Sequence, residues 1–512
     1  MPDSPIIEPV PAPVPAAAAE PAVKTVAPAP SPAPASAPGR APAPARAEAE
    51  RLRADVIQLA QDLIRVNTSN LPGNETAAAH VISNYLALSG VACALHEGVP
   101  GRACLVATIE RSAEAAVDQR PSLAFCGHTD VVPAIDNDRW THPPFAGHLD
   151  DDGFLWGRGA VDMKGQVAAR VVAFAHIARS GWALGGDLRL ICQADEERGD
   201  AGTGMEWLTT NHPEYRVDYS IDEGGGERLA LADGRVLSPL ALGEKACLAA
   251  RITAKGIAGH ASMPTVGANA VPLLATLIVR LAAHRCSLDI SPQMAVALDV
   301  LAQVHGNDKP TVSGIPVDAA AEQAVRDRVA RCVALAPQLE HELPALISLT
   351  IAATGLVGSD TRNVMPADAS VELDCRLLPG QTPDDLEREL RAAMGDDIDY
   401  IIELLAEQPD GGSVSPLDSP VVDACRAFLA TRQPDSQLLP ALSTGFTDSH
   451  HLRSVWGTHA YGFAPVRHTP LDLYMGGVHG IDERIHVEDL VELVDFHLFL
   501  AHHVLIFDAL SG

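Results

Sequence analysis

Short apolar runs alternate with helical stretches through the first half of this chain, and acidic or imidazole side chains follow the runs directly. Runs such as SLAFCGHTD, DLRLICQADEE and VDYSIDEGG have the length of buried strands, and KGQVAARVVAFAHIARSG has the length of a helix. Strands that alternate with helices indicate a mainly parallel sheet covered by helices on both faces. Ligands of such sheets bind beyond the carboxyl ends of the strands. The pattern therefore predicts an α/β fold with a polar site at one edge of the sheet.

The same pattern divides the chain into segments. Residues 1–46 are dominated by Pro and Ala, cannot bury a core and are predicted to be a disordered tail, with a docking role as the alternative. The α/β pattern occupies 47–242 and returns in 409–512, whereas 243–408 has a strand–helix–strand–helix pattern. The 512 residues thus predict a larger α/β domain in two parts, with a smaller α+β domain inserted into it. Within the insertion, 305–345 departs from the pattern and is expected to be a helical excursion.

Charge and cysteine usage narrow the possible partners and compartment. The formal net charge of −29 argues against binding to nucleic acid or to an anionic membrane surface. No apolar run approaches the roughly 18 residues of a membrane span. The nine cysteines are scattered singly, without a CxxC pair, which predicts reduced thiols. These features favour a cytoplasmic protein.

The side chains at the predicted strand ends suit divalent metals, because nitrogen and oxygen ligands of this mix bind zinc, cobalt or manganese. They are His128 and Asp130 in GHTD, Asp162 in GRGAVDMKG, Glu196 and Glu197 in ADEE, Asp222 and Glu223 in SIDEGGG, and His479 in GGVHG. A free carboxylate beside a ligand carboxylate can carry the proton in a metal-assisted hydrolysis. Each fragment alone has a plainer explanation: a buried His–Asp pair, a helix N-cap, a solvated acidic loop or an exposed loop His. Their joint order favours a two-metal hydrolase.

Taken together, these segments resemble the M20 family of metallopeptidases and amidohydrolases. GHTDVVP, GRGAVDMKG, ADEE, DEGG, GHASMP, NVMPADASVELDCRLLPG and GGVHGIDERI occur in family order, and the resemblance runs from about residue 47 to the C-terminus. It implies a zinc-hydrolase α/β domain with an inserted ferredoxin-like lid, through which a homodimer could form. It also implies a pair of divalent ions, Zn²⁺ first, with Co²⁺ or Mn²⁺ as alternatives.

The resemblance also implies which residues hold the two ions. The matching positions are His128, Asp162, Glu197, Asp222 and His479, with Asp162 as the bridge. Asp222 and Glu223 are adjacent, and from the residues alone either could be the ligand, since the glycines that follow allow close backbone approach. Glu196 corresponds to the general base. Asp130 corresponds to the residue that supports the first His, where a carboxylate fixes the tautomer of a ligating imidazole.

Three residues of the inserted domain correspond to positions that contact substrate. His260 of GHAS matches an oxyanion-stabilising histidine that the partner subunit often supplies. Asn363 and Arg376 match positions that contact substrate, where a cation, here the arginine, can hold a carboxylate. The implied activity is hydrolysis of an amide bond in a peptide or an N-acyl amino acid. The alternatives are a deacetylase or desuccinylase of amino-acid biosynthesis, and a metal- or peptide-binding protein without catalysis.

Overall fold

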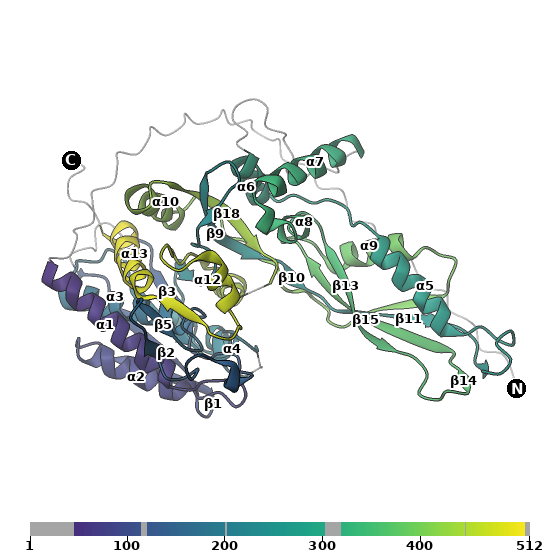
Figure 1. Cartoon of the computed structure of the whole chain (residues 1–512), viewed down its shortest axis with the longest axis horizontal. Helices are drawn as coiled ribbons and strands as arrows, with labels where there is room; N and C mark the ends of the chain where they lie inside the picture. Colours follow the sequence, from purple (N-terminus) through teal and green to yellow (C-terminus); the bar gives the residue numbers. More distant parts are fainter. Residues whose placement is uncertain (1–45, 114–119, 200–201, 303–318, 446, 507–512) are drawn as a thin grey trace, which may run out of the picture. The chain divides into compact units, whose positions relative to one another are not determined.

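The computed structural model describes residues 46–113, 120–199, 202–302, 319–445 and 447–506 (Figure 1). The predicted Pro/Ala-rich tail therefore lies outside the described residues, apart from its last position, which begins helix α1 (Arg46–Arg65). Among the described helices, none combines the length and apolar character that a membrane span requires. All nine cysteines lie in the described part, and each is a free thiol.

The larger sheet is built from nine strands of the described residues. In spatial order they are β1 (Cys93–Val99), β2 (Arg102–Ile109), β6 (Leu188–Gln193), β3 (Leu123–His128), β7 (Tyr219–Asp222), β19 (His459–Gly462), β9 (Val236–Glu244) and β18 (Ser436–Ser443), with β8 (Leu229–Ala230) paired to β9. The central pairs β6–β3, β3–β7 and β7–β19 are parallel, as is β9–β18. The predicted α/β class is confirmed. Antiparallel pairs occur at β1–β2, β2–β6, β8–β9 and β19–β9.

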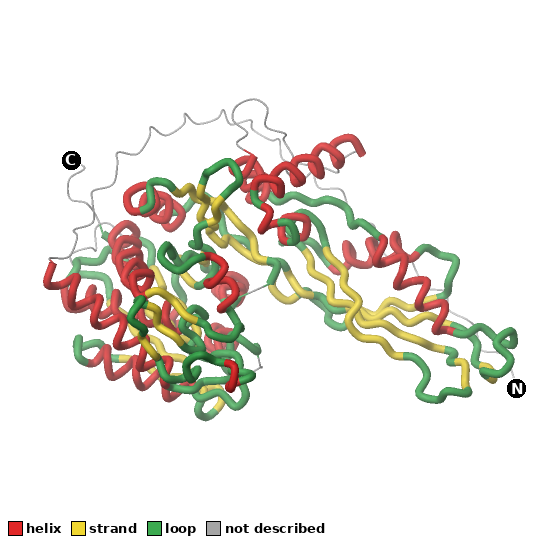
Figure 2. The backbone as a smooth tube through the Cα atoms, in the orientation of Figure 1, coloured by secondary structure: helices red, strands yellow, loops and turns green. Residues whose placement is uncertain are grey.

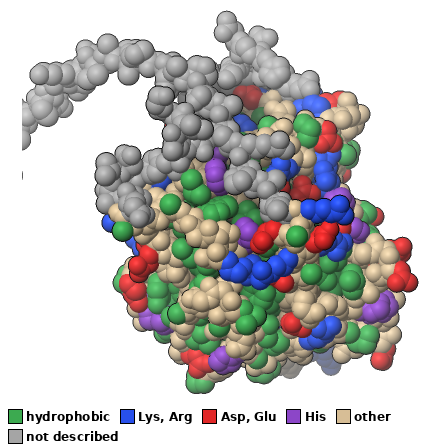
Figure 3. Space-filling view, turned by 90° about the vertical axis from the view of Figure 1, so that its left-hand side faces the viewer, with side chains coloured by type: hydrophobic (Ala, Val, Ile, Leu, Met, Phe, Trp, Pro, Cys, Tyr) green, Lys and Arg blue, Asp and Glu red, His purple; other side chains and the backbone are tan. Residues whose placement is uncertain are grey.

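Both faces of this sheet are buried. Successive side chains of a strand point to opposite faces, so neighbouring residues show the two sides of the sheet. In β3, Leu123 and Phe125 pack into one hydrophobic core, while Ala124 and Cys126 pack into another. Helices α1, α3 (Lys164–Ser180) and α13 (Val487–Leu505) pack on one another in the first core, and α10 (Pro420–Arg432) packs against α13 (Figure 1). α2 (Glu75–Ala87) packs on β2, and α4 (Gly204–Asn211) belongs to the second core. Acidic and basic side chains are interspersed on the surface drawn in Figure 3.

A second sheet, six strands among the described residues, lies within the predicted insertion and is antiparallel throughout. Its strands are β16 (Tyr400–Leu404), β11 (Ala250–Lys255), β15 (Asp368–Leu377), β10 (Ala246–Cys247) and β17 (Asp410–Gly411), with β13 (Thr350–Val357) also paired to β15. Helices α5 (Ala270–Ala283) and α9 (Pro383–Met394) cover one face of it, as Figure 2 shows. Their buried side chains share a core with the sheet. Thr382 and Asp385 form a capping box that starts α9. The domain boundaries and the function of this part as a lid remain predictions.

The excursion expected at 305–345 is helical where the structure describes it, and its packing assigns it to the larger sheet. Within that range, α7 (Ala319–Leu335) and α8 (Glu342–Ala345) bury Val325 and Leu343 in the same core as α3 and α13. Helix α6 (Pro292–Ala302), which precedes the range, buries Leu298 there as well. α6 packs on β18. The insertion therefore contains a helical segment that stabilises the larger domain.

Short elements complete the structure. They are β4 (His148–Leu149), β5 (Phe154–Trp156) and β20 (Arg484–His486) in one small sheet, β12 (Gly259–His260) and β14 (Val364–Met365) in another, and the helices α11 (Ser449–His451) and α12 (Leu471–Gly477). β20 leads directly into α13 and brings the loop after α12 beside the loop before α3, because β20 pairs with β5.

Candidate metal centre

Three neighbouring parallel strands bring most of the predicted ligands to one edge of the larger sheet. His128 is the last residue of β3, Glu196 and Glu197 follow the end of β6 closely, and Glu223 follows β7 directly. Because β6, β3 and β7 run in parallel, their carboxyl ends meet at this edge. Two further side chains come from loops: Asp162 precedes α3, and His479 follows α12 with a left-handed backbone (φ 57°).

Asp162 links the two imidazoles of the group. His128 Nε2 lies 3.1 Å from Asp162 Oδ1, and His479 Nε2 lies 3.4 Å from Asp162 Oδ2. Each imidazole also has a glutamate of its own: Glu223 Oε2 is 3.5 Å from His128 Nε2, and Glu197 Oε2 is 2.8 Å from His479 Nε2. The result is two half-sites, each with one His and one Glu, that share the two oxygens of one carboxylate.

Glu223, rather than Asp222, enters this group. Among the described residues, the potential ligand sets around His128 include Glu223, Glu196, Asp162 and Glu197, and not Asp222. Asp222 is 1% exposed, and its Oδ1 accepts the backbone N–H of Glu223 at 2.9 Å. Its Oδ2 is buried without a hydrogen-bond partner among the described residues. The geometry thus favours Glu223 as the ligand and gives Asp222 the position behind it.

Glu196 and Asp130, the residues that correspond to the general base and to the support of the first His, both lie beside His128. Glu196 Oε2 is 3.9 Å from His128 Nε2, at the edge of the group. The carboxylate of Asp130 is fully buried and accepts the backbone N–H groups of Glu196 and Glu197, each at 3.1 Å. The Asp130 carbonyl oxygen is 3.1 Å from His128 Nδ1, which orients the imidazole. Asp130 therefore fixes three members of the group at once.

An ion pair not foreseen from the sequence joins the two loops. Arg158 and Glu483 are buried and 2.7 Å apart. Glu483 accepts backbone N–H groups from Gly159, Val161 and Asp162, and Arg158 donates to the carbonyl oxygens of His479 and Gly480. Arg158 lies in GRGAVDMKG and Glu483 lies in GGVHGIDERI, two segments that carry the family resemblance. The joint occurrence of these segments is the sequence signal that could have pointed to the pair.

The electrostatics of the group fit cations. Four carboxylates face two imidazoles, and burial together with the neighbouring Glu223 raises the pKa of Glu196 well above its ordinary range. Burial also raises the pKa of Glu223. Hydrogen bonds to Asp162 and Glu197 raise the pKa of His479 to about 10. Such a group retains protons for lack of positive charge, and divalent ions with His nitrogen and carboxylate oxygen ligands would supply that charge.

The three residues predicted to contact substrate lie outside this group. His260 and Asn363 are exposed and close to each other: Ala261 donates its N–H to the Asn363 carbonyl oxygen beside the β12–β14 pair. His260 Nδ1 accepts hydrogen bonds from Ser262. Arg376 lies on β15, where its guanidinium donates to both carboxylate oxygens of Asp374, at 2.7 and 3.1 Å. Contact of these residues with substrate remains a prediction.

Comparison with known proteins identifies relatives over most of the chain. The model of peptidase family M20/M25/M40 matches residues 124–503. A probable carboxypeptidase S-like 2 of Dictyostelium discoideum is 26% identical over 387 residues, which cover 74% of this chain and 70% of that protein. A succinyl-diaminopimelate desuccinylase of Hydrogenovibrio crunogenus is 24% identical over 454 residues, 87% of this chain and 97% of that protein. The M20 family metallo-carboxypeptidase Sso-CP2 of Sulfolobus solfataricus has a similar fold (TM-score 0.58, 19% identity, 88% and 99% coverage).

Proposed function

The chain belongs to peptidase family M20/M25/M40 and is an enzyme that acts on amide bonds, and we propose that it hydrolyses a peptide or an N-acyl amino acid at the group around Asp162. The observation that carries this proposal is the bridging geometry. The two oxygens of Asp162 face different imidazoles, and each imidazole has its own glutamate. An arrangement with one shared carboxylate suits two neighbouring ions.

In this proposal, His128, Glu223 and Asp162 would hold the first ion. Glu197, His479 and the shared Asp162 would hold the second. Zn²⁺ fits this donor set, and Co²⁺ or Mn²⁺ could replace it. When bound, the two ions would polarise the substrate carbonyl and lower the pKa of water.

Glu196 is the general base in this proposal. Its carboxylate lies beside the ligand group and is not required to complete either half-site. It takes a proton from the attacking water and returns it to the leaving nitrogen, a step that typically contributes about 10²–10⁴-fold. Asp130 positions this base, since it holds the backbone N–H of Glu196 and that of the ligand Glu197.

The inserted domain supplies the substrate contacts. We propose that His260 stabilises the oxyanion and that Asn363 and Arg376 hold the substrate, with Arg376 bound to its free carboxylate. Approach of the two domains would bring these residues to the reacting bond. A homodimer through this domain is part of the proposal, as is a cytoplasmic location, which the nine free thiols support.

A second candidate differs only in the acyl group removed. The alignment with the succinyl-diaminopimelate desuccinylase of Hydrogenovibrio crunogenus covers 97% of that protein. Removal of a succinyl or acetyl group from an amino acid would use the same two metal ions and the same base. Release of free amine from dipeptides, N-acyl amino acids and N-succinyl amino acids would separate the two candidates.

The test of the mechanism is Glu196→Gln. The variant should bind as many divalent ions as the wild type, by elemental analysis, and lose about 10²–10⁴-fold in kcat. Glu206→Gln is the matched control, because Glu206 is an exposed residue of α4. Chelation should abolish the wild-type activity, and added Zn²⁺ should restore it. Normal turnover in a fully metallated Glu196→Gln variant would contradict the proposed base.

A further inference from the structure

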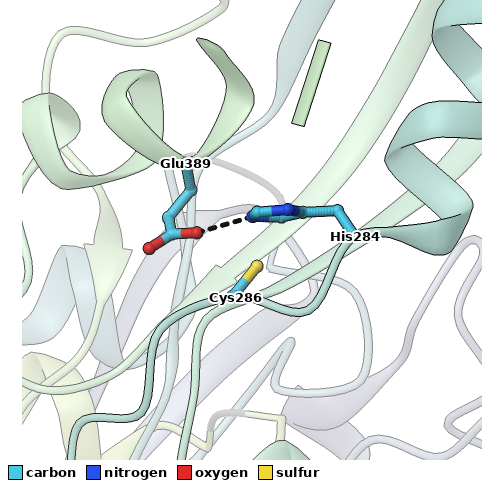
Figure 4. A group of neighbouring side chains, drawn as sticks. All are labelled: His284, Cys286 and Glu389. Atoms are coloured by element: carbon cyan, nitrogen blue, oxygen red, sulfur yellow. Dashed lines mark hydrogen bonds and ion pairs between the residues drawn. The ribbon is translucent and has the colours of Figure 1, made fainter. Parts of the chain in front are cut away.

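A further group of potential metal ligands lies on the helical side of the second sheet. His284 directly follows the last residue of α5, Cys286 lies two residues further on, and Glu389 projects from α9 toward both, as Figure 4 shows. One ligand atom of each residue lies within 4.8 Å of the others. None of these residues belongs to the group around Asp162, so this cluster requires an explanation of its own.

The local backbone directs the imidazole and the thiol to the same side. His284 has an extended conformation (φ −70°, ψ 142°), and Cys286 follows it at a spacing of two. Side chains two residues apart in extended backbone point to the same face. The segment after α5 thus presents a nitrogen and a sulfur ligand toward α9.

The carboxylate on α9 is held in place from two sides. Glu389 is only 8% exposed, although glutamate is rarely buried unless it is paired. His284 Nε2 lies 2.8 Å from one of its oxygens, and the backbone N–H of Ser287 donates to the other at 3.2 Å. These two contacts hold the carboxylate in one orientation. A positioned carboxylate therefore faces the imidazole and the thiol.

We propose that His284, Cys286 and Glu389 bind a Zn²⁺ ion that joins the C-terminal end of α5 to α9. Thiolate, imidazole and carboxylate are ligands that zinc accepts in a tetrahedral site, with water as the fourth ligand. The thiolate and the carboxylate together neutralise a divalent charge. Zinc binds cysteine as the thiolate, so metal binding at this site would release the thiol proton.

The position of this site suggests what it does. α5 and α9 pack on each other and on the second sheet, and their shared core includes Leu277, Leu281 and Leu390. A bound ion would cross-link the two helices at their edge and stabilise the folded domain by its binding free energy. The proposed role is structural, separate from hydrolysis.

Sulfur makes the site spectroscopically distinct, because the group around Asp162 contains no cysteine. The full-length protein loaded with Co²⁺ should show a thiolate-to-cobalt charge-transfer absorption. Cys286→Ser should remove that absorption and lower the metal content by one ion per chain. Cys247→Ser is the control, since Cys247 is a half-buried thiol of the second sheet that lies outside the ligand group. It should change neither the absorption nor the metal content.

Two further variants separate this proposal from the proposed hydrolase centre. Asp162→Ala should lose ions from the hydrolase centre and keep the thiolate–cobalt absorption. His284→Gln should lose the absorption and keep the activity, with folding checked by circular dichroism. The proposal is overturned if Co²⁺-loaded wild type shows no thiolate absorption, or if the absorption persists in Cys286→Ser.

Discussion

Asp222 and Glu223 are adjacent acids that the structure places in different surroundings. Glu223 faces His128, whereas Asp222 accepts the Glu223 N–H and is almost completely buried. The carboxylate that faces an imidazole can share a cation with it. The carboxylate behind it accepts the backbone N–H of the residue that faces the imidazole.

We therefore expect Glu223→Ala and Asp222→Asn to differ in metal content. Glu223→Ala should lose about one ion per chain and most activity, because one half-site keeps only His128 and the shared Asp162. Asp222→Asn should keep both ions of the centre, since its amide oxygen can still accept the Glu223 N–H. Elemental analysis of the two purified variants checks this. The reverse result, with the ion lost from Asp222→Asn, would restore Asp222 as the ligand.

The positions of the strand ends could be predicted from the sequence, but the face of the sheet to which each terminal side chain points could not. Apolar runs that end in polar residues locate His128 and Glu197 at the edge of the sheet, because β3 and β6 are buried along their length. At β7 the choice between two adjacent acids depends on the strand's last residue, since neighbouring side chains point to opposite faces. The Arg158–Glu483 pair could not be foreseen from spacing, because it joins residues 325 apart.

At the scale of elements, α6 and α8 cover one end of the larger sheet and leave a cavity of about 260 Å³ beside it. The lining includes Met294 and Leu343 of these helices, Leu439 of β18, and the carboxylates Glu227 and Glu342. α6 precedes the helical excursion predicted at 305–345, and its mostly apolar sequence does not indicate which core it joins. The sequence therefore predicted a helical excursion, and its attachment to the larger domain required the three-dimensional structure.

Glu227 gives this region a pH-dependent stability. Burial raises the pKa of Glu227 from 4.5 to about 7. Between these values the folded state holds a proton that the unfolded state has released, so the free energy of unfolding should fall as pH rises from about 4.5 to 7. Glu227→Gln removes this penalty and should be more stable than wild type at pH 8 by about 1–3 kcal/mol, with little advantage below pH 4.5.

Urea unfolding of the metal-loaded protein at several pH values measures this difference. Glu340→Gln, an exposed neighbour of α8, is the control and should follow the wild type at every pH. Equal stability of wild type and Glu227→Gln at pH 8 would mean that the Glu227 carboxylate is solvated in the folded state.

At the scale of the whole molecule, the proposed activity requires the two domains to act together. Arg376 belongs to the second sheet and is paired with Asp374, so substrate would share or replace that partner. We expect Arg376→Ala to raise KM about 10–100-fold for substrates with a free carboxylate, since a hydrogen bond to a charged group contributes about 1.5–3 kcal/mol. An amidated substrate should show little change. Arg388→Ala, an exposed arginine of α9, is the control. Equal losses on both substrates would argue against carboxylate recognition.

In helix α1, the side chains that contribute to the main hydrophobic core begin several residues after the start of the helix. Arg46 and Glu50 of α1 are highly exposed, and the buried face begins at Leu52 and Val56. An exposed ion pair contributes at most about 1 kcal/mol. Deletion of residues 1–45 should therefore change kcat/KM, metal content and the free energy of unfolding very little. Deletion of residues 1–56 removes two buried side chains of the main core and should cost several kcal/mol, since large-to-small changes there cost about 2–5 kcal/mol each. A loss of activity or metal in the shorter deletion would mean that the Pro/Ala-rich segment takes part in the enzyme itself.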